Sequence, residues 1–241
     1  MTIRRGMPER VAAVLGQRIV KGDFPVGQTI PPEAALIAEF SVSRPVLREA
    51  IKLLSARGLV EIKQKVGTRV TPRESWALLD SEVLSWQLKS GQDQGSMIRQ
   101  LIEVRAIVEP AASRLAALRA TADQVAAMRF ALEEMEKALE VDDSMAFIEA
   151  DLRFHNGILL GCRNLLLLQM NATVASSLRM SREISSRSPS ASVSSIPLHK
   201  ALLDRIAAQQ PFAAQMAAER LVDRTRSDIA ALLPDVDFSD D

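Results

Sequence analysis

The sequence predicts a mainly α fold: three helices and a small β-hairpin, followed by an all-α bundle of six or seven helices. Apolar residues recur at helical spacing along most of the chain, and the period changes from 3.6 to 2 only between residues 59 and 70. The 241 residues suffice for two domains, each with its own core. Three helices followed by a hairpin are the order of a winged helix-turn-helix.

The N-terminal pattern contains three helices with recognisable ends. The first is expected over residues 8–20, where Gly22 can take the left-handed conformation that ends a helix. The second is expected to open at Pro31-Pro32-Glu33 and to end near Phe40, because prolines and a glutamate suit a first turn. The third is expected to be capped by Ser41 or Ser43, to run to about Ala56 and to be ended by Gly58.

A short hairpin follows, and helices fill the rest of the chain. Two β-like runs, 59–62 and 68–70, flank a turn over 63–67. The later helices are expected at about 75–90, 96–119, 122–140, 143–162, 164–186, 196–209 and 211–232. The Ser-rich stretch over 185–195 is the most loop-like segment, although a frayed helix end would have the same pattern. The expected division is a winged helix-turn-helix over 1–72, a linker with a connecting helix over 73–95, and a helical domain over 96–235.

Charge is distributed unevenly, although the formal net charge is zero. Residues 1–73 carry 13 basic and 6 acidic residues, a net charge of +7, which the rest of the chain balances. A basic N-terminal part suits the phosphates of double-stranded DNA.

The sequence also bears on the cell compartment. No run of about 18 apolar residues is present that could cross a bilayer, and the N-terminus lacks the apolar stretch of a signal peptide. The single Cys162 cannot form an intramolecular disulfide. We therefore expect a cytoplasmic protein with no membrane partner.

The third predicted helix carries basic residues on one face. Arg44, Arg48 and Lys52 recur every four residues, beside an apolar arc formed by Val46, Leu47, Ala50, Ile51 and Leu54. An arginine near the start of such a helix can donate two hydrogen bonds to guanine. An isolated helix with these residues would more often be a solvated face, but three helices with a basic hairpin favour DNA binding.

The hairpin adds further basic residues. Lys63, Lys65 and Arg69 surround Gly67, which allows the backbone to approach a duplex closely. A wing of this kind usually lies along a groove of the DNA.

Residues 8–71 resemble the DNA-binding domain of the GntR family. The resemblance is carried by three runs: Gly22–Glu33, then Phe40–Ala50, which holds Ser43, Arg44, Pro45 and Arg48, and then Leu54 through Gly58 to Val70. It implies a homodimer on a palindromic operator, with Arg44 and Arg48 reading bases and the wing in the minor groove. Two positions depart from the family pattern: Ala34 replaces a common arginine, and Lys65 replaces a common glycine.

Residues 96–232 resemble the FCD ligand-binding domain of the FadR-type subfamily. The matching runs are Leu101–Arg105, Glu109-Pro110, Leu115–Ala117, Asp151–His155 and Leu198-His199. The resemblance implies a helical bundle around a pocket, in which one aspartate and three histidines often hold a divalent metal that helps to bind a carboxylate effector.

The metal-ligand pattern is incomplete in this chain. Asp151 and His155 are four residues apart and can face one cavity, and His199 occupies the position of a third ligand. The fourth histidine falls at about Arg220, and arginine cannot ligate a metal. A set of this kind suits Zn, Ni or Mn, but the same residues can also form an ordinary polar core.

Two arginines are candidates for effector binding. Arg220 can take the place of the metal and bind the effector's carboxylate through its planar fork. Arg105 matches an arginine that often faces the pocket in this family, although it can instead pair with Glu109 on the same helix.

Several functions are weighed at this point. The segment containing Trp76 and Trp86 resembles the sugar-acid (galactonate-type) branch of the subfamily, so a sugar acid is the first expected effector; packing between domains also explains these tryptophans. Dicarboxylates, lactate or pyruvate, and acyl ligands are the alternatives. A metal-dependent enzyme is a remote alternative, because no nucleophile motif surrounds Cys162. A pure interaction module is excluded only by sequence-selective DNA binding.

Overall fold

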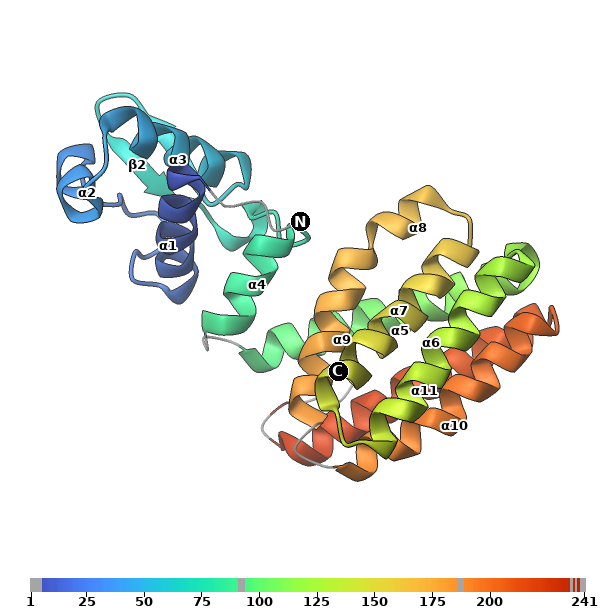
Figure 1. Ribbon diagram of the computed structural model, residues 1–241. Coiled ribbons are helices and arrows are strands. Elements are labelled where there is room, and N and C mark those ends of the chain that lie inside the picture. The colour runs from blue at the N-terminus through green and yellow to red at the C-terminus, as the bar shows by residue number, and fades with distance from the viewer. Residues whose placement is uncertain (1–5, 91–93, 186–188, 235, 237, 239–241) are drawn as a thin grey trace. The chain divides into compact units, whose positions relative to one another are not determined.

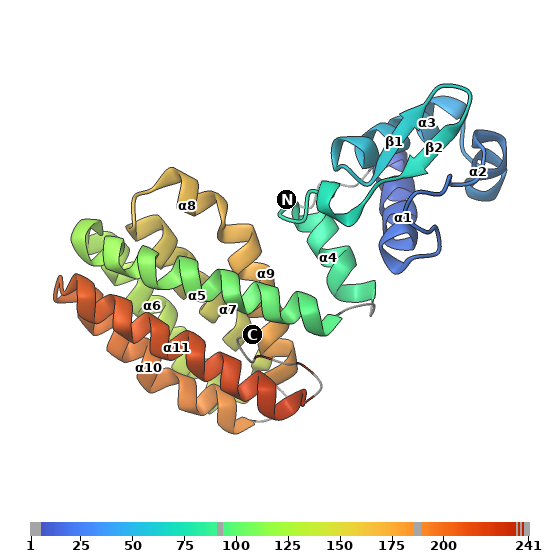
Figure 2. The ribbon, with the colours of Figure 1, turned by 180° about the vertical axis from the view of Figure 1, so that it is seen from behind.

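The computed structural model describes residues 6–90, 94–185, 189–234, 236 and 238. The chain divides into two compact units, Met1–Gln94 and Gly95–Asp241, here called unit 1 and unit 2. Figures 1 and 2 show both from opposite sides. Helices dominate, and the strands of the described part form one antiparallel pair, so the predicted fold class is confirmed. Within the described residues, no helix has the length and apolarity needed to cross a membrane.

Unit 1 contains three helices and a hairpin. The helices are α1 (Met7–Lys21), α2 (Glu33–Phe40) and α3 (Arg44–Ala56), followed by β1 (Val60–Lys63) and β2 (Gly67–Val70). Gly22 ends α1 with a φ of 88°, as its sequence position predicted. The hairpin pairs Val60 with Val70, and the segment before α2 joins it through a single bridge from Thr29 to Arg69.

Residues 73–90 pack with unit 1. The short 3₁₀ helix η1 (Arg73–Ser75) leads to α4 (Ser81–Ser90), which lies against α1. Trp76 and Trp86 are both buried in the core of unit 1. The contact is close: a Cβ on Gly16 of α1 would stand only 2.3 Å from the ring of Trp86. The two tryptophans therefore attach the segment expected as a linker to the helices of the DNA-binding motif.

Unit 2 is a bundle of seven helices in its described part. They are α5 (Gln94–Arg119), α6 (Ala122–Glu140), α7 (Ser144–Gly161), α8 (Leu165–Gln169), α9 (Asn171–Ser185), α10 (Pro189–Ala207) and α11 (Pro211–Leu232). Helices α6 and α7 lie side by side, and α7 also contacts α9. Their shared core is apolar and includes Phe154, Met128 and Leu202. The predicted capping box that opens α6 is present, with Thr121 and Gln124 bonded reciprocally.

Two local predictions in unit 2 were wrong. The helix expected over 164–186 is two helices that are separated at Met170, and Asn164 caps the first of them by accepting from the amides of Leu166 and Leu167. The Ser-rich stretch expected as a loop is helical from Pro189 onward, since proline is tolerated in a first turn and Ser195 bonds back to Ser192 within the helix. Residues 186–188 of that expected loop lie outside the described residues.

Candidate DNA-contacting surface and candidate ligand site

Helix α3 presents basic residues on one exposed face. Pro45 stands in its first turn, where a fixed φ is favourable, and Ser43 precedes the helix as N-cap. Arg44, Arg48 and Lys52 expose 64%, 59% and 67% of their side chains. The opposite face is buried and consists of Leu47, Ala50, Ile51 and Leu54. The core therefore holds the helix while its basic face stays open to a partner.

Two of these arginines share an acidic neighbour on α2. The Oε1 atom of Glu33 lies 3.2 Å from Arg48 Nε, and its Oε2 atom lies 3.8 Å from Arg44 Nε. All three side chains are more than a third exposed, so the pairing is weak. Sequence reasoning gave Glu33 only a role in opening α2, because this pairing depends on how two helices pack.

The wing has an exposed tip and a fixed base. At the tip, Lys65 has a φ of 63° and Gly67 a φ of 113°, both in the left-handed region. That geometry favours glycine, which explains why glycine is common at the position of Lys65. At the base, Arg69 is half-buried and its Nε donates a hydrogen bond to the carbonyl of Gly27. Lys65 is thus free to reach outward, whereas Arg69 also holds a turn.

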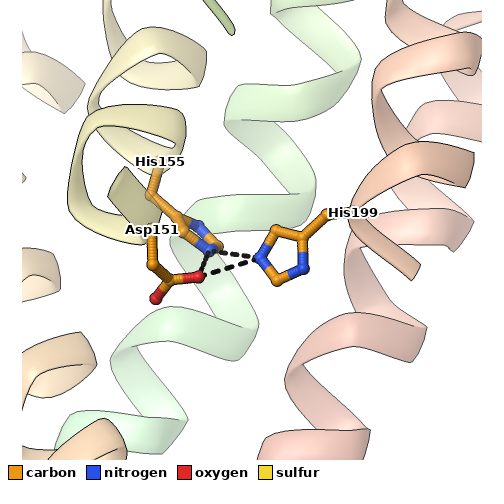
Figure 3. Close-up of side chains that lie close together, drawn as sticks. All are labelled: Asp151, His155 and His199. Atoms are coloured by element: carbon orange, nitrogen blue, oxygen red, sulfur yellow. Dashed lines mark hydrogen bonds and ion pairs between the residues drawn. The ribbon is translucent and has the colours of Figure 1, made fainter. Parts of the chain in front are cut away.

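Unit 2 brings Asp151, His155 and His199 together in its interior. Asp151 and His155 lie one turn apart on α7, and His199 comes from α10 (Figure 3). The Oδ1 atom of Asp151 lies 3.0 Å from His199 Nε2 and 3.8 Å from His155 Nε2, and the two Nε2 atoms are 3.4 Å apart. All three residues are buried.

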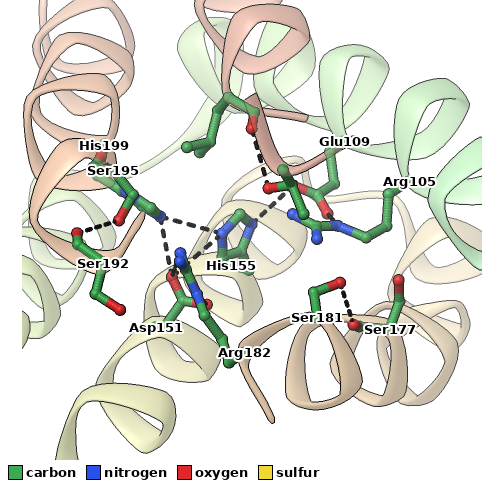
Figure 4. Close-up of polar contacts among 12 residues, drawn as sticks. Arg105, Glu109, Asp151, His155, Ser177, Ser181, Arg182, Ser192, Ser195 and His199 are labelled. Atoms are coloured by element: carbon green, nitrogen blue, oxygen red, sulfur yellow. Dashed lines mark hydrogen bonds and ion pairs between the residues drawn. The ribbon is translucent and has the colours of Figure 1, made fainter. Parts of the chain in front are cut away.

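A second layer of polar groups orients both imidazole rings (Figure 4). His155 Nδ1 lies 2.8 Å from Oε2 of Glu109, and Oε1 of Glu109 accepts a 2.6 Å hydrogen bond from Arg105. His199 Nδ1 lies 2.8 Å from the carbonyl oxygen of Ser195. Both Nδ1 atoms thus lie beside acceptor oxygens, while both Nε2 atoms lie on the side of Asp151.

Arg182 of α9 is the residue of this site that sequence reasoning missed. Its Nε and NH2 atoms donate hydrogen bonds of 3.0 and 2.9 Å to the two oxygens of Asp151. A signal was present in the sequence, because Val174, Leu178 and Arg182 recur every four residues and all are buried. An arginine at a core position of an amphipathic helix needs a buried carboxylate as its partner.

Six residues make up what we call the buried charge cluster: Arg105, Glu109, Asp151, His155, Arg182 and His199. Burial alone raises the pKa of Asp151, but the Arg182 guanidinium and a hydrogen bond from His199 bring it well below its usual range. Burial likewise raises the pKa of Glu109, and Arg105 and His155 lower it to about 2. Burial lowers the pKa of His199. At neutral pH the two carboxylates are therefore ionised and face two guanidinium groups.

The structure contradicts the expected role of Arg220 in effector binding. For Arg105, it shows which of the two expected roles the side chain takes. Arg220 is exposed on α11, whereas the adjacent Leu221 is buried in the core of unit 2. Successive residues of a helix point about 100° apart, so Arg220 is turned away from the buried charge cluster. Arg105 is buried but is held by Glu109 on its own helix.

The arrangement of the donor atoms suits a divalent metal. Ligand atoms about 2.0–2.2 Å from a common ion stand roughly 3.0–3.5 Å apart, and the observed separations are 3.0, 3.4 and 3.8 Å. Two imidazole Nε2 atoms and one carboxylate oxygen converge on one point, and this is a set of ligand atoms that a divalent cation accepts. Asp151, His155 and His199 therefore form a candidate metal site.

A cavity of about 160 Å³ adjoins this site. Arg182 and Phe147 are among its lining residues, together with Ser144, Ser192 and Asp143 at its polar side. Arg182 thus contacts Asp151 and also borders a space that a small molecule can enter.

Comparison with protein families matches both units. Residues 8–70 match the model described as bacterial regulatory proteins of the gntR family, and residues 100–224 match the FCD domain. The chain belongs to the GntR family and carries an FCD domain. It is a DNA-binding transcription regulator, and the alternative of an enzyme is set aside.

Two curated relatives of this GntR regulator show where the similarity extends. The galactonate operon transcriptional repressor of Escherichia coli K12 is 37% identical over 218 residues, which cover 89% of this chain and 93% of that protein. The repressor NanR of Salmonella bongori is 36% identical over 152 residues, covering 63% of this chain and 56% of NanR. The first similarity therefore includes both units.

Solved structures share the fold of this GntR regulator. A structure titled for Lar, which controls the expression of the Listeria monocytogenes agr system, has a TM-score of 0.65 at 18% identity and covers 96% of this chain and all of its own. The structure of Streptococcus agalactiae GntR has a TM-score of 0.52 at 24% identity. The match covers 91% of this chain and 99% of that structure's chain.

Proposed function

We propose that the chain is a homodimeric repressor that binds a palindromic operator and releases it when a small sugar acid binds unit 2. The observation that carries this proposal is the 37% identity with the galactonate operon repressor over 89% of the chain. Operator binding also implies a place in the cytoplasm, where the DNA lies.

In the proposed complex, α3 enters the major groove. Arg44 at its N-terminal end and Arg48 one turn later meet base edges, while Ser43 and Pro45 fix where the helix begins. Lys52 lies another turn along the same exposed face and meets a phosphate. The open position of these side chains supports these roles.

The wing adds contacts that position the protein. Lys65 at the exposed tip neutralises a phosphate, and Gly67 lets the backbone approach the groove. Arg69 acts from the base of the wing, where it also holds Gly27.

The proposed effector is an anion because the guanidinium group of Arg182 lines the cavity beside the candidate metal site. Arg182 borders the cavity and is the group that an entering carboxylate meets, in place of Arg220. Arg105 acts indirectly by holding Glu109 against His155. A divalent ion held by Asp151, His155 and His199 would add positive charge that attracts the same carboxylate.

Effector binding changes operator affinity only by favouring one of two arrangements of the dimer. An acid that binds both arrangements equally well leaves DNA binding unchanged, however tightly it binds. The response to an acid is therefore a separate test from binding itself.

The experiment measures binding of the full-length protein to an operator that it selects from random DNA. D-Galactonate is expected to lower operator affinity, and D-galactose, which lacks the carboxylate, is the matched control. Release by succinate or lactate alone would replace the sugar acid by another carboxylate. If no acid changes operator affinity while the operator is bound, the effector part of the proposal is wrong.

A further inference from the structure

One oxygen atom of Asp151 contacts Arg182 and also belongs to the candidate metal site. Asp151 Oδ1 accepts a hydrogen bond from Arg182 NH2 at 2.9 Å, and the same atom lies 3.0 Å from His199 Nε2. It is therefore both one of the three donor atoms of the candidate metal site and the acceptor of a guanidinium group. Arg182 Nε holds the other oxygen of Asp151 at 3.0 Å, so the pairing is bidentate.

The charges of the cluster balance without a bound ion. The carboxylates of Glu109 and Asp151 face the guanidinium groups of Arg105 and Arg182, and all four side chains are nine-tenths or more buried. A divalent cation beside Asp151 would place two further positive charges next to Arg182. Repulsion between like charges is strong in a buried, weakly polar environment, so both cations cannot share Asp151 at full strength.

Arg182 has an alternative position close at hand. Its side chain lines the cavity of about 160 Å³, and its guanidinium carbon lies 5.1 Å from the centre of the Phe147 ring, another lining residue. A guanidinium that leaves Asp151 can therefore turn toward this cavity without crossing the core.

We propose that the Arg182 guanidinium is an internal competitor of the metal: it occupies Asp151 in the metal-free protein, and a divalent cation binds there as Arg182 turns toward the cavity. This inference rests on the proposed ligand site. Once released, Arg182 takes an anionic ligand as its new partner. A divalent metal and a carboxylate therefore strengthen each other's binding, and the coupling is reciprocal.

The first test measures the affinity of tag-free, metal-stripped, full-length protein for Ni²⁺ by calorimetry. Arg182→Met removes the competing charge and is expected to bind Ni²⁺ at least about ten-fold more tightly, since groups beside metal ligands change affinity by this order. Arg179→Met is the matched control, because Arg179 is also on α9 and pairs with Glu149 of α7, yet is 44% exposed. It is expected to leave Ni²⁺ affinity unchanged.

One further variant and one further measurement keep the result interpretable. Adding Asp151→Asn to Arg182→Met should abolish the gain, which locates the ion at Asp151. If Arg182→Met does not fold in chelator, its helical circular dichroism signal is followed during Ni²⁺ addition. If Arg182 competes with the metal, Ni²⁺ should restore the helical signal of the variant. If Arg182 only joins α9 to α7, Ni²⁺ should not restore it.

The coupling is tested by repeating the Ni²⁺ titration with D-galactonate present. Chelation of Ni²⁺ by free galactonate can only weaken the apparent affinity, so a tighter value in the unchanged protein supports the inference. The same addition should not tighten binding in Arg182→Met.

An equal or weaker Ni²⁺ affinity in Arg182→Met overturns the competitor role. Operator binding of the same variants is measured in parallel. An operator response to galactonate that persists beside an unchanged Ni²⁺ affinity would leave the proposed function standing and remove only this inference.

Discussion

The arginines of α3 and those of the buried charge cluster form the same chemical pair, a guanidinium with a carboxylate, in opposite environments. On α3, Arg44 and Arg48 share the exposed Glu33 and remain mostly in water. Such pairs contribute little to stability, so DNA can replace the carboxylate at small cost.

In unit 2 the pairs are cut off from water. Arg105 lies 2.6 Å from Glu109, and Arg182 lies 2.9 Å from Asp151, with both carboxylates fully or almost fully buried. Losing one partner leaves a buried charge that nothing compensates. The difference teaches that an exposed pair can exchange with an external partner at small cost, whereas a buried pair can give up one member only when another charge takes its place.

The largest expected effect is on stability. Glu109→Gln should lower the free energy of unfolding by about 3–5 kcal/mol, because it leaves the buried Arg105 without an opposite charge. Urea unfolding followed by circular dichroism measures it. The control is Glu134→Gln, whose partner Arg153 is 52% exposed; it should change stability by less than about 1 kcal/mol. If both variants lost a similar free energy of unfolding, the buried pair and the exposed pair would not differ in their contribution to stability.

A smaller effect is expected on sequence selection by α3. Arg44→Ala should reduce the preference for operator over random DNA by about 1–3 kcal/mol, as for loss of a bidentate base contact. The free energy of unfolding of the Arg44→Ala variant should change by less than about 0.5 kcal/mol, because the side chain is exposed. Fluorescence anisotropy on both DNAs measures the preference. Equal weakening on the two would show that Arg44 contacts phosphate instead of bases.

The shared carboxylate on α2 should oppose binding without selecting sequence. Glu33→Gln removes a negative charge from beside Arg44 and Arg48 and should tighten binding to random DNA by about 0.2–1 kcal/mol. Glu39→Gln is the control on the same helix, since Glu39 pairs with Arg18 instead. An equal gain in the two variants would mean that only net charge matters.

The smallest effect concerns the tip of the wing. Lys65→Ala should lower the slope of log affinity against log salt by about one unit, with little change in sequence preference. Lys65→Gly should do the same while relieving the left-handed backbone at this position. A slope that stays constant in both variants would remove Lys65 from the DNA contacts.

The two regions were not equally accessible to sequence reasoning. The basic face of α3 could be predicted because its periodicity lies within one helix of a continuous motif. In the buried charge cluster, Asp151, His155 and His199 were recognised by resemblance to a family, whereas Arg182 was missed. Its partner lies 31 residues away and on another helix. Arg220 lies on the exposed side of α11, and its place in the family pattern did not reveal this, because each step along a helix turns the side chain by about 100°.

The close contact of Gly16 with Trp86 shows how far the DNA-binding body extends along the chain. It joins α4 to α1, so the body that carries α3 extends to the end of α4. Ten helical residues span about 15 Å. Helix α4 is therefore part of the same compact unit as α3 and the wing, and about 15 Å of helix separates its two ends.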